Sequence, residues 1–196
     1  MRIVWLRGDY VGNHERQQQA KKEGVDIVLS LHFNSASQQA NGAEFYFNSK
    51  CSQSVIQIGN NFCAFLVARF GIRFRGGKPA KYTRAAFIEF YHCPTLLFEP
   101  CFVSNPKEAS LLHRPDTIPA MAAQLGRLVF EWCITTLGNS AVIGIDVGHM
   151  FKTSNPKDRG ALCIGGKSCT EAQHALELAY ALEKELLKHI RNIQTE

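Results

Sequence analysis

The chain has 196 residues, of which 45% are hydrophobic and 20% are charged. This length and composition fit one well-buried domain and exclude a mostly disordered chain. The formal net charge of +5 favours an anionic polymer as partner, whether nucleic acid, an acidic membrane surface or cell wall. Because the basic residues are scattered and no aromatic-basic motif of a nucleic-acid-binding module occurs, we predict no nucleic-acid partner.

The first seven residues are basic, but their apolar stretch is too short for the core of a signal peptide. No apolar stretch in the sequence reaches membrane-spanning length. We therefore expect synthesis in the cytoplasm without a signal peptide and no insertion into a membrane. The sequence does not indicate an oligomeric state.

Seven cysteines occur, without C-x-x-C spacing. Most of them, Cys63, Cys93, Cys101 and Cys133, lie in or beside apolar runs. Buried, reduced thiols fit this pattern best.

Strands and helices alternate along the sequence. In chain order we predict strand 2–6, helix 13–23, strands 26–31 and 43–47, helix 52–70, strands 85–90 and 95–98, helices 106–112 and 116–137, strand 141–147 and helix 170–192. This order predicts a single α/β domain over residues 1–196, with a twisted, mostly parallel sheet of about six strands flanked by helices. Segments 72–84 and 150–169 have the Gly, Pro and Lys content of exposed loops.

The last helix has the clearest start signal. Thr170 is suited to the N-cap position and Gln173 follows three residues later, as in a capping box. This places Glu171 in the first turn of the helix.

Residues suited to metal binding or acid-base chemistry follow three predicted strands. His32 comes after 26–31, Glu99 after 95–98, and His149 shortly after 141–147. The carboxyl ends of parallel strands meet at one edge of a sheet, so these side chains are expected to converge there. Glu171 is expected at the same edge, because the connection leading to its helix starts there.

Two imidazoles and a carboxylate, with a fourth position left to water, form a recurring catalytic zinc site. His32, His149 and Glu171 match this set, so we expect one zinc ion per chain. Hydrolysis of an amide also needs a carboxylate to move protons, and Glu99 is the candidate.

Each of these residues also has an ordinary structural explanation. A histidine after a strand is commonly a hydrogen-bonded or surface residue, and Glu171 suits the positive end of the helix dipole. Glu99 has Arg84 or Lys81 as alternative ion-pair partners. Glu171 and His174, three residues apart on one helix, form an alternative ligand face.

Several segments at these residues resemble the zinc-dependent N-acetylmuramoyl-L-alanine amidases, a family that includes sporulation and phage lytic enzymes. Segment 30–36, Ser-Leu-His-Phe-Asn-Ser-Ala, resembles the family's Ser-x-His-x-Asn-Ala motif. Segment 98–108 resembles its Glu-x-Gly-Phe-x-Ser-Asn-x-x-Glu stretch, in which the first Glu is catalytic. The resemblance implies that Glu99 is the catalytic carboxylate, that His32 binds zinc and that Asn34 contacts substrate.

The order of the segments is rotated relative to that family. Its members open with a strand ending in Asp-x-Gly-His and a helix beginning with a Glu ligand, but here segments 146–149 and 171–172 carry these features near the C-terminus. Residues 1–137 resemble the family's second part and residues 138–196 its first. The resemblance therefore implies a circularly permuted amidase fold in which His149 and Glu171 complete the zinc site.

The resemblance implies a peptidoglycan hydrolase that acts on the cell wall. It would cleave the amide between N-acetylmuramic acid and the L-alanine of the stem peptide. Two alternatives remain open: another zinc peptidase acting on cell-wall peptides, and a non-catalytic wall-binding protein on the same fold.

Overall fold

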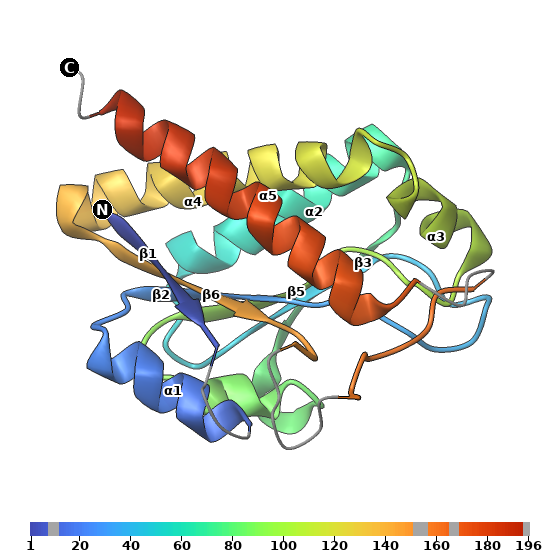
Figure 1. The fold of residues 1–196 in the computed structure, drawn as a ribbon, viewed down its shortest axis with the longest axis horizontal. Helices are drawn as coiled ribbons and strands as arrows, with labels where there is room; N and C mark the ends of the chain where they lie inside the picture. Colours follow the sequence, from blue (N-terminus) through green and yellow to red (C-terminus); the bar gives the residue numbers. More distant parts are fainter. Residues whose placement is uncertain (8–11, 151–156, 165–168, 194–196) are drawn as a thin grey trace.

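The computed structural model describes residues 1–7, 12–150, 157–164 and 169–193. Six strands form one sheet in the order β1-β6-β2-β5-β3-β4 (Figure 1). Their bounds are β1 Arg2–Leu6, β2 Ile27–Leu31, β3 Ala43–Phe47, β4 Phe74–Pro79, β5 Thr95–Glu99 and β6 Val142–Val147. The single α/β domain with a six-stranded, mostly parallel sheet is confirmed.

The last strand in the sequence lies inside the sheet. β6 pairs in parallel with β1 on one side and with β2 on the other. Asp146 of β6 is therefore opposite Leu6 of β1 and Ser30 of β2. β2 and β5 are also parallel, whereas β3 runs antiparallel to β5. The carboxyl ends of β6, β2 and β5 therefore meet at one edge.

Helices cover both faces of the sheet, with α2, α4 and α5 on one face and α1 on the other (Figure 1). The helix bounds are α1 Asn13–Lys22, α2 Gln53–Phe70, α3 Pro106–Leu112, α4 Thr117–Leu137 and α5 Glu171–Asn192. The larger core lies under α2, α4 and α5, and a smaller core lies under α1 and the segment 80–93. Apolar positions at helical spacing on α5, such as Leu178, Leu182 and Leu186, are fully buried in the larger core.

The start of α5 matches the prediction. The side chain of Thr170 accepts a hydrogen bond from the backbone N–H of Gln173 at 3.2 Å, and the helix begins at Glu171. The N-cap fixes the direction of the first turn, and with it the position of the Glu171 side chain.

Two predicted segments differ from the structure. Segment 85–90 was expected as a strand, but Ala86–Phe90 forms a 3-10 helix that buries Ile88 and leaves Phe90 75% exposed. Its apolar run packs against one sheet face and does not pair with a strand. Within the expected loop 72–84, Phe74–Pro79 forms edge strand β4, whose glycines and charged residues are typical of an exposed edge.

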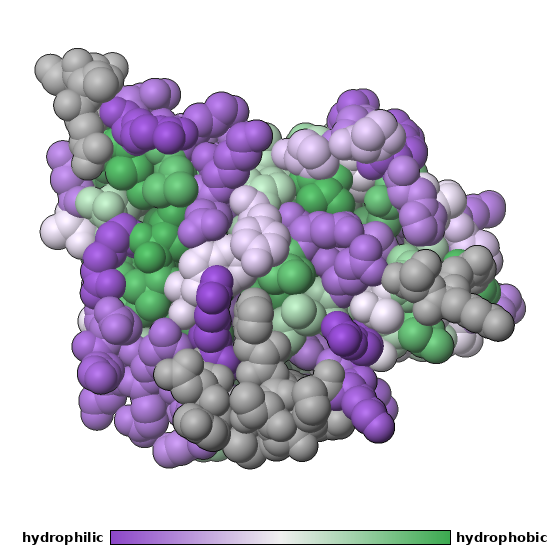
Figure 2. All heavy atoms as spheres, in the orientation of Figure 1, coloured by the Kyte–Doolittle hydropathy of each residue, from purple (hydrophilic) through white to green (hydrophobic). Residues whose placement is uncertain are grey.

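No helix among the described residues combines the length and the apolar character needed to cross a membrane. Figure 2 shows a face on which hydrophilic side chains surround smaller hydrophobic areas. The expected loop 150–169 falls partly outside the described residues, since 151–156 and 165–168 belong to the gaps. Within 157–164 the chain forms neither a helix nor a strand, but Leu162 makes an isolated antiparallel β-bridge with Thr170.

Candidate metal and catalytic site

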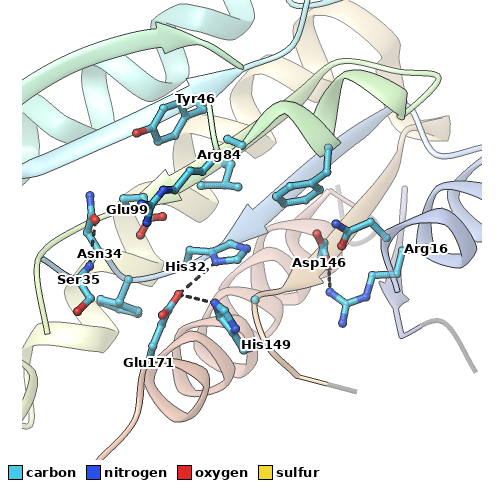
Figure 3. Close-up of a pocket in the computed structure, with 16 residues that line it drawn as sticks. Arg16, His32, Asn34, Ser35, Tyr46, Arg84, Glu99, Asp146, His149 and Glu171 are labelled. Atoms are coloured by element: carbon cyan, nitrogen blue, oxygen red, sulfur yellow. Dashed lines mark hydrogen bonds and ion pairs between the residues drawn. The ribbon is translucent and has the colours of Figure 1, made fainter. Parts of the chain in front are cut away.

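Two imidazoles and one carboxylate converge at the carboxyl edge of the sheet (Figure 3). His32 follows β2, His149 lies two residues beyond β6, and Glu171 is the first residue of α5. Glu171 Oε1 lies 3.2 Å from His32 Nδ1 and 3.1 Å from His149 Nε2. One ligand atom from each residue lies within 4.8 Å of the other two, so the three residues form a compact donor set.

The backbone around the donors leaves no space for extra side-chain atoms. A Cβ at Gly148 would lie 2.5 Å from the His32 ring, and one at Gly160 would lie 2.6 Å from Glu171 Oε2. His149 itself has φ 59°, the only positive value at a described non-glycine residue. A left-handed conformation at a bulky residue costs free energy and is typical of functional sites.

Two donors have further partners. His149 Nδ1 lies 2.8 Å from Asp158 Oδ1, so the carboxylate can fix the tautomer that leaves Nε2 free to bind a metal. Glu171 Oε2 accepts a hydrogen bond from the Ala161 N–H at 3.1 Å. The loop before α5 therefore orients both a histidine and the carboxylate.

The electrostatics keep the Glu171 carboxylate ionised. Burial raises the pKa of Glu171, but hydrogen bonds with His149 and His32 outweigh this effect and lower the pKa to about 2. The hydrogen bond with Glu171 raises the pKa of His149, while burial opposes the rise and Asp158 adds to it. An anionic carboxylate between two imidazoles suits a divalent cation.

Glu99 ends β5 and faces the same pocket, partly exposed to it (Figure 3). Burial, followed by the negative charges of Glu171 and Glu44, raises the pKa of Glu99 well above its ordinary value. Its Oε2 atom is buried without a hydrogen-bond partner. No ion pair joins Glu99 to Arg84 or Lys81 among the described residues, although Arg84 lines the same pocket.

Glu44 faces Glu99 across β3 and β5. Its buried carboxylate contacts Arg75 Nε at 2.8 Å and Lys78 Nζ, and it accepts a hydrogen bond from Asn34 Nδ2 at 2.7 Å. Burial raises the pKa of Glu44, but hydrogen bonds from Lys78 and Arg75 lower it to about 2. Asn34 thus lies on the pocket wall with its amide N–H group bound to Glu44.

A buried ion pair lies beside the donor set. Arg16 of α1 pairs with Asp146 of β6, and both side chains are almost fully buried. Arg16 also donates to the backbone carbonyls of Val147, at 3.0 Å, and Met150, and Ser30 donates to the second Asp146 oxygen at 2.8 Å. These contacts hold the chain just before and after His149.

The site opens into a pocket of about 400 Å³. Its walls carry the donor set, Glu99, Asn34 and the aromatic side chains of Tyr46 and Phe87.

All four residues expected to carry the chemistry line this pocket, together with Asn34. His174, the alternative partner of Glu171, instead contacts Cys169 Sγ at 2.9 Å and Glu177 Oε2 at 3.0 Å. Sequence reasoning missed Asp158, which lies in a segment read only as a loop. The sequence indicated Asp158 only in that it is the one acidic residue between His149 and Glu171.

The cysteine prediction holds in part. Cys63, Cys93, Cys101 and Cys133 are buried and free, as expected. A disulfide joins Cys163 to Cys169, which the sequence did not predict because C-x-x-C spacing is absent.

A family model of N-acetylmuramoyl-L-alanine amidases matches residues 4–129, more than half of the chain. The chain belongs to this amidase family. The match includes His32, Asn34 and Glu99. β6, His149 and Glu171 lie outside it, although β6 is an interior strand of the sheet.

Solved structures of amidases share the fold. An N-acetylmuramoyl-L-alanine amidase from Clostridium difficile 630 is 19% identical with a TM-score of 0.54, covering 65% of this chain and 68% of the other. The catalytic domain of the amidase CwlV from Bacillus (Paenibacillus) polymyxa var. colistinus is 22% identical with a TM-score of 0.51, covering 62% of this chain and 65% of the other.

Cwp6 from Clostridium difficile is 20% identical with a TM-score of 0.55 over 62% of this chain. The amidase-family chain spans 20% of Cwp6 and 65% of the CwlV domain, less than two thirds of either. No curated protein sequence matches the chain.

Proposed function

We propose that this chain is a zinc-dependent N-acetylmuramoyl-L-alanine amidase that cleaves the amide between N-acetylmuramic acid and L-alanine in peptidoglycan. The observation that carries the proposal is the convergence of His32, His149 and Glu171 beside Glu99 in one pocket. The family to which the chain belongs supplies the substrate class.

The donor set fits zinc better than calcium or magnesium. Two imidazole nitrogens and one carboxylate oxygen form the three-ligand set of catalytic zinc sites, whereas calcium and magnesium favour all-oxygen sites. The Asp158 carboxylate on His149 is the outer partner that such a ligand usually has. His32, His149 and Glu171 would hold one zinc ion per chain.

A zinc ion at this position would polarise the amide carbonyl and lower the pKa of a bound water. Glu99 then performs the proton transfers. Its carboxylate takes a proton from the attacking water and passes that proton to the leaving nitrogen of L-alanine. Burial and the neighbouring negative charges raise the pKa of Glu99, which favours the protonated form that donates to the leaving nitrogen.

Other side chains of the pocket would position the polymer. Asn34 lines the pocket, and its side-chain amide donates a hydrogen bond to Glu44. We assign Asn34 to substrate binding. The net positive charge of the chain complements an anionic wall polymer.

Product analysis of purified peptidoglycan tests the proposal. The wild-type chain should release new amino termini of L-alanine only, and Glu99→Gln should reduce that release at least a hundredfold while keeping bound zinc. Glu131→Gln, which changes an exposed carboxylate on α4, is the matched control and should leave cleavage unchanged.

Two alternatives correspond to other outcomes of this experiment. Amino termini of a later stem-peptide residue would identify a zinc peptidase. Binding to the wall without new termini and without an effect of Glu99→Gln would identify a non-catalytic wall-binding protein.

We also propose that the chain is a circular permutant of its family. The proposal is supported by the family match, which ends at residue 129, and by β6, which lies late in the sequence but between β1 and β2. The start of β1 and the end of α5 lie on the same side of the molecule (Figure 1), and Trp5 Nε1 of β1 donates to Glu183 of α5 at 2.6 Å. Joining 193 to 1 through a flexible linker and opening the chain at 138 should therefore give a folded variant with the same zinc content. Failure of this variant to fold would argue against the permutation.

A further inference from the structure

The segment before α5 forms a short two-stranded ladder with the start of the helix. Cys163 N–H donates to the Cys169 carbonyl at 3.0 Å, and Glu171 N–H donates to the Ala161 carbonyl at 2.8 Å. Leu162 and Thr170 form an antiparallel bridge between these two bonds. The ladder places Ala161 beside the Glu171 carboxylate.

A disulfide between Cys163 and Cys169 closes this ladder. Cys163 lies two residues after Ala161, whose N–H binds Glu171 Oε2, and Cys169 lies two residues before Glu171. The same segment carries Asp158, the partner of His149. The disulfide therefore constrains the segment that carries the hydrogen-bond partners of both Glu171 and His149.

His174 and Glu177 form a polar pair beside this disulfide. His174 Nε2 lies 2.9 Å from Cys169 Sγ, and its Nδ1 lies 3.0 Å from Glu177 Oε2. The His174 side chain is 5% exposed, whereas that of Glu177 is 44% exposed, so the imidazole is shielded from water and its carboxylate partner lies at the surface. An imidazole hydrogen-bonded to a carboxylate on one side and facing sulfur on the other is suited to thiol chemistry at that sulfur.

We propose that Cys163 and Cys169 are a redox-modification site that controls metal binding at His32, His149 and Glu171. The reductant that opens the disulfide would be a dithiol. The inference rests on the zinc site of the proposed function. The disulfide form keeps the loop on Glu171, and the dithiol form releases it.

The chemical step balances without a further reactant. A thiolate of the reductant attacks Cys163 Sγ, the bond to Cys169 Sγ breaks, and the Cys169 sulfur leaves beside His174. The second thiol of the reductant then attacks the mixed disulfide and frees Cys163. The protein gains two thiols, and the reductant leaves as its disulfide.

Opening the ladder should weaken metal binding without unfolding the domain. Glu171 stays on α5, which is packed in the larger core, but its carboxylate loses the fixed Ala161 N–H and His149 loses a fixed Asp158. Loss of such outer partners typically costs ten- to a hundredfold in metal affinity. A loss of this size is expected on reduction.

The test compares the oxidised and reduced chain in zinc titrations against a fluorescent chelator. Tris(2-carboxyethyl)phosphine, removed before the titration, produces the same dithiol form of the chain that a dithiol reductant would give. Thiol counting under denaturing conditions should give five thiols in the oxidised chain and seven in the reduced one. We expect reduction to lower zinc affinity at least tenfold and reoxidation to restore it. Cys163→Ser/Cys169→Ser should behave as the reduced chain and ignore the reductant, whereas Cys51→Ser should respond like the wild type.

A measurement on the metal-free chain separates this inference from the proposed function. Amide hydrogen exchange at Cys163 and Glu171 should accelerate at least tenfold on reduction, while amides of β6 keep their protection. If the oxidised chain binds no zinc, the proposed function fails and the exchange result still decides whether the disulfide holds the loop.

Two results would overturn the inference. One is unchanged zinc affinity and unchanged exchange after complete reduction. The other is a second zinc ion gained on reduction and lost in His174→Ala, because Cys163, Cys169 and His174 would then be a metal site in their own right.

Discussion

His149 Nδ1 lies 2.8 Å from Asp158 Oδ1, while the opposite ring nitrogen of His149 lies 3.1 Å from Glu171 Oε1. The imidazole is therefore held on one side by a carboxylate and directed on the other into the donor set. This arrangement assigns Asp158 an orienting role, although it is nine residues away from His149 in the sequence.

Replacing Asp158 with asparagine should lower zinc affinity about ten- to a hundredfold, since the amide no longer fixes the tautomer or supports the basicity of His149. Zinc titration against a chelator measures the effect. Asp116→Asn, which alters an exposed ion pair at the start of α4, is the control and should keep wild-type affinity. Equal affinities in all three chains would exclude the orienting role.

As the pH falls, zinc affinity should begin to drop at a higher pH than it would for a site whose histidines have ordinary pKa values. The hydrogen bond with Glu171 raises the pKa of His149 above 6.5, so protons compete with the metal already above that pH. Affinity is therefore full at alkaline pH and is lost as the pH falls through the raised pKa. Titrations between pH 8.5 and pH 5.5 should show this loss, and Asp158→Asn should shift it to lower pH, because Asp158 also raises the pKa.

The sequence predicted the convergence of these residues because they sit at strand ends and at a helix start. His32, Glu99 and His149 follow strands whose apolar runs are unmistakable, and Glu171 follows an N-cap residue. Strand β4 was missed because an edge strand tolerates Gly77 and Lys78, which read as a loop. Asp158 and the Cys163–Cys169 pair were missed because their partners are set by tertiary contacts in an irregular segment.

Loss of Arg16 should destabilise the whole domain. Arg16→Ala leaves the Asp146 carboxylate buried and without its partner, which should cost about 3–5 kcal/mol of unfolding free energy. Arg69→Ala breaks an exposed pair with Asp116 and should cost at most about 1 kcal/mol. Urea unfolding of both variants at neutral pH measures the difference, and similar costs for the two would contradict the account of the buried pair.

Acid should destabilise the chain partly through Glu44. The folded pKa of about 2 lies below the ordinary 4.5, so the stabilisation is complete above pH 4.5 and is lost as the pH falls toward 2. We expect a contribution on the order of 2 kcal/mol, since Lys78 and Arg75 are partly exposed and water screens them. Unfolding curves at pH 6 and pH 3 should differ less for Glu44→Gln than for the wild type, and an equal acid sensitivity would refute this role.

The central claim is that His32, His149 and Glu171 bind one catalytic zinc ion, and adding zinc back to the metal-free chain tests it most directly. Chelation should abolish release of L-alanine amino termini from peptidoglycan, and activity should return in proportion to added zinc up to one equivalent per chain. Glu171→Gln should need a large excess of zinc for the same activity. Full activity in the metal-free chain, or no activity after one equivalent is bound, would contradict the account.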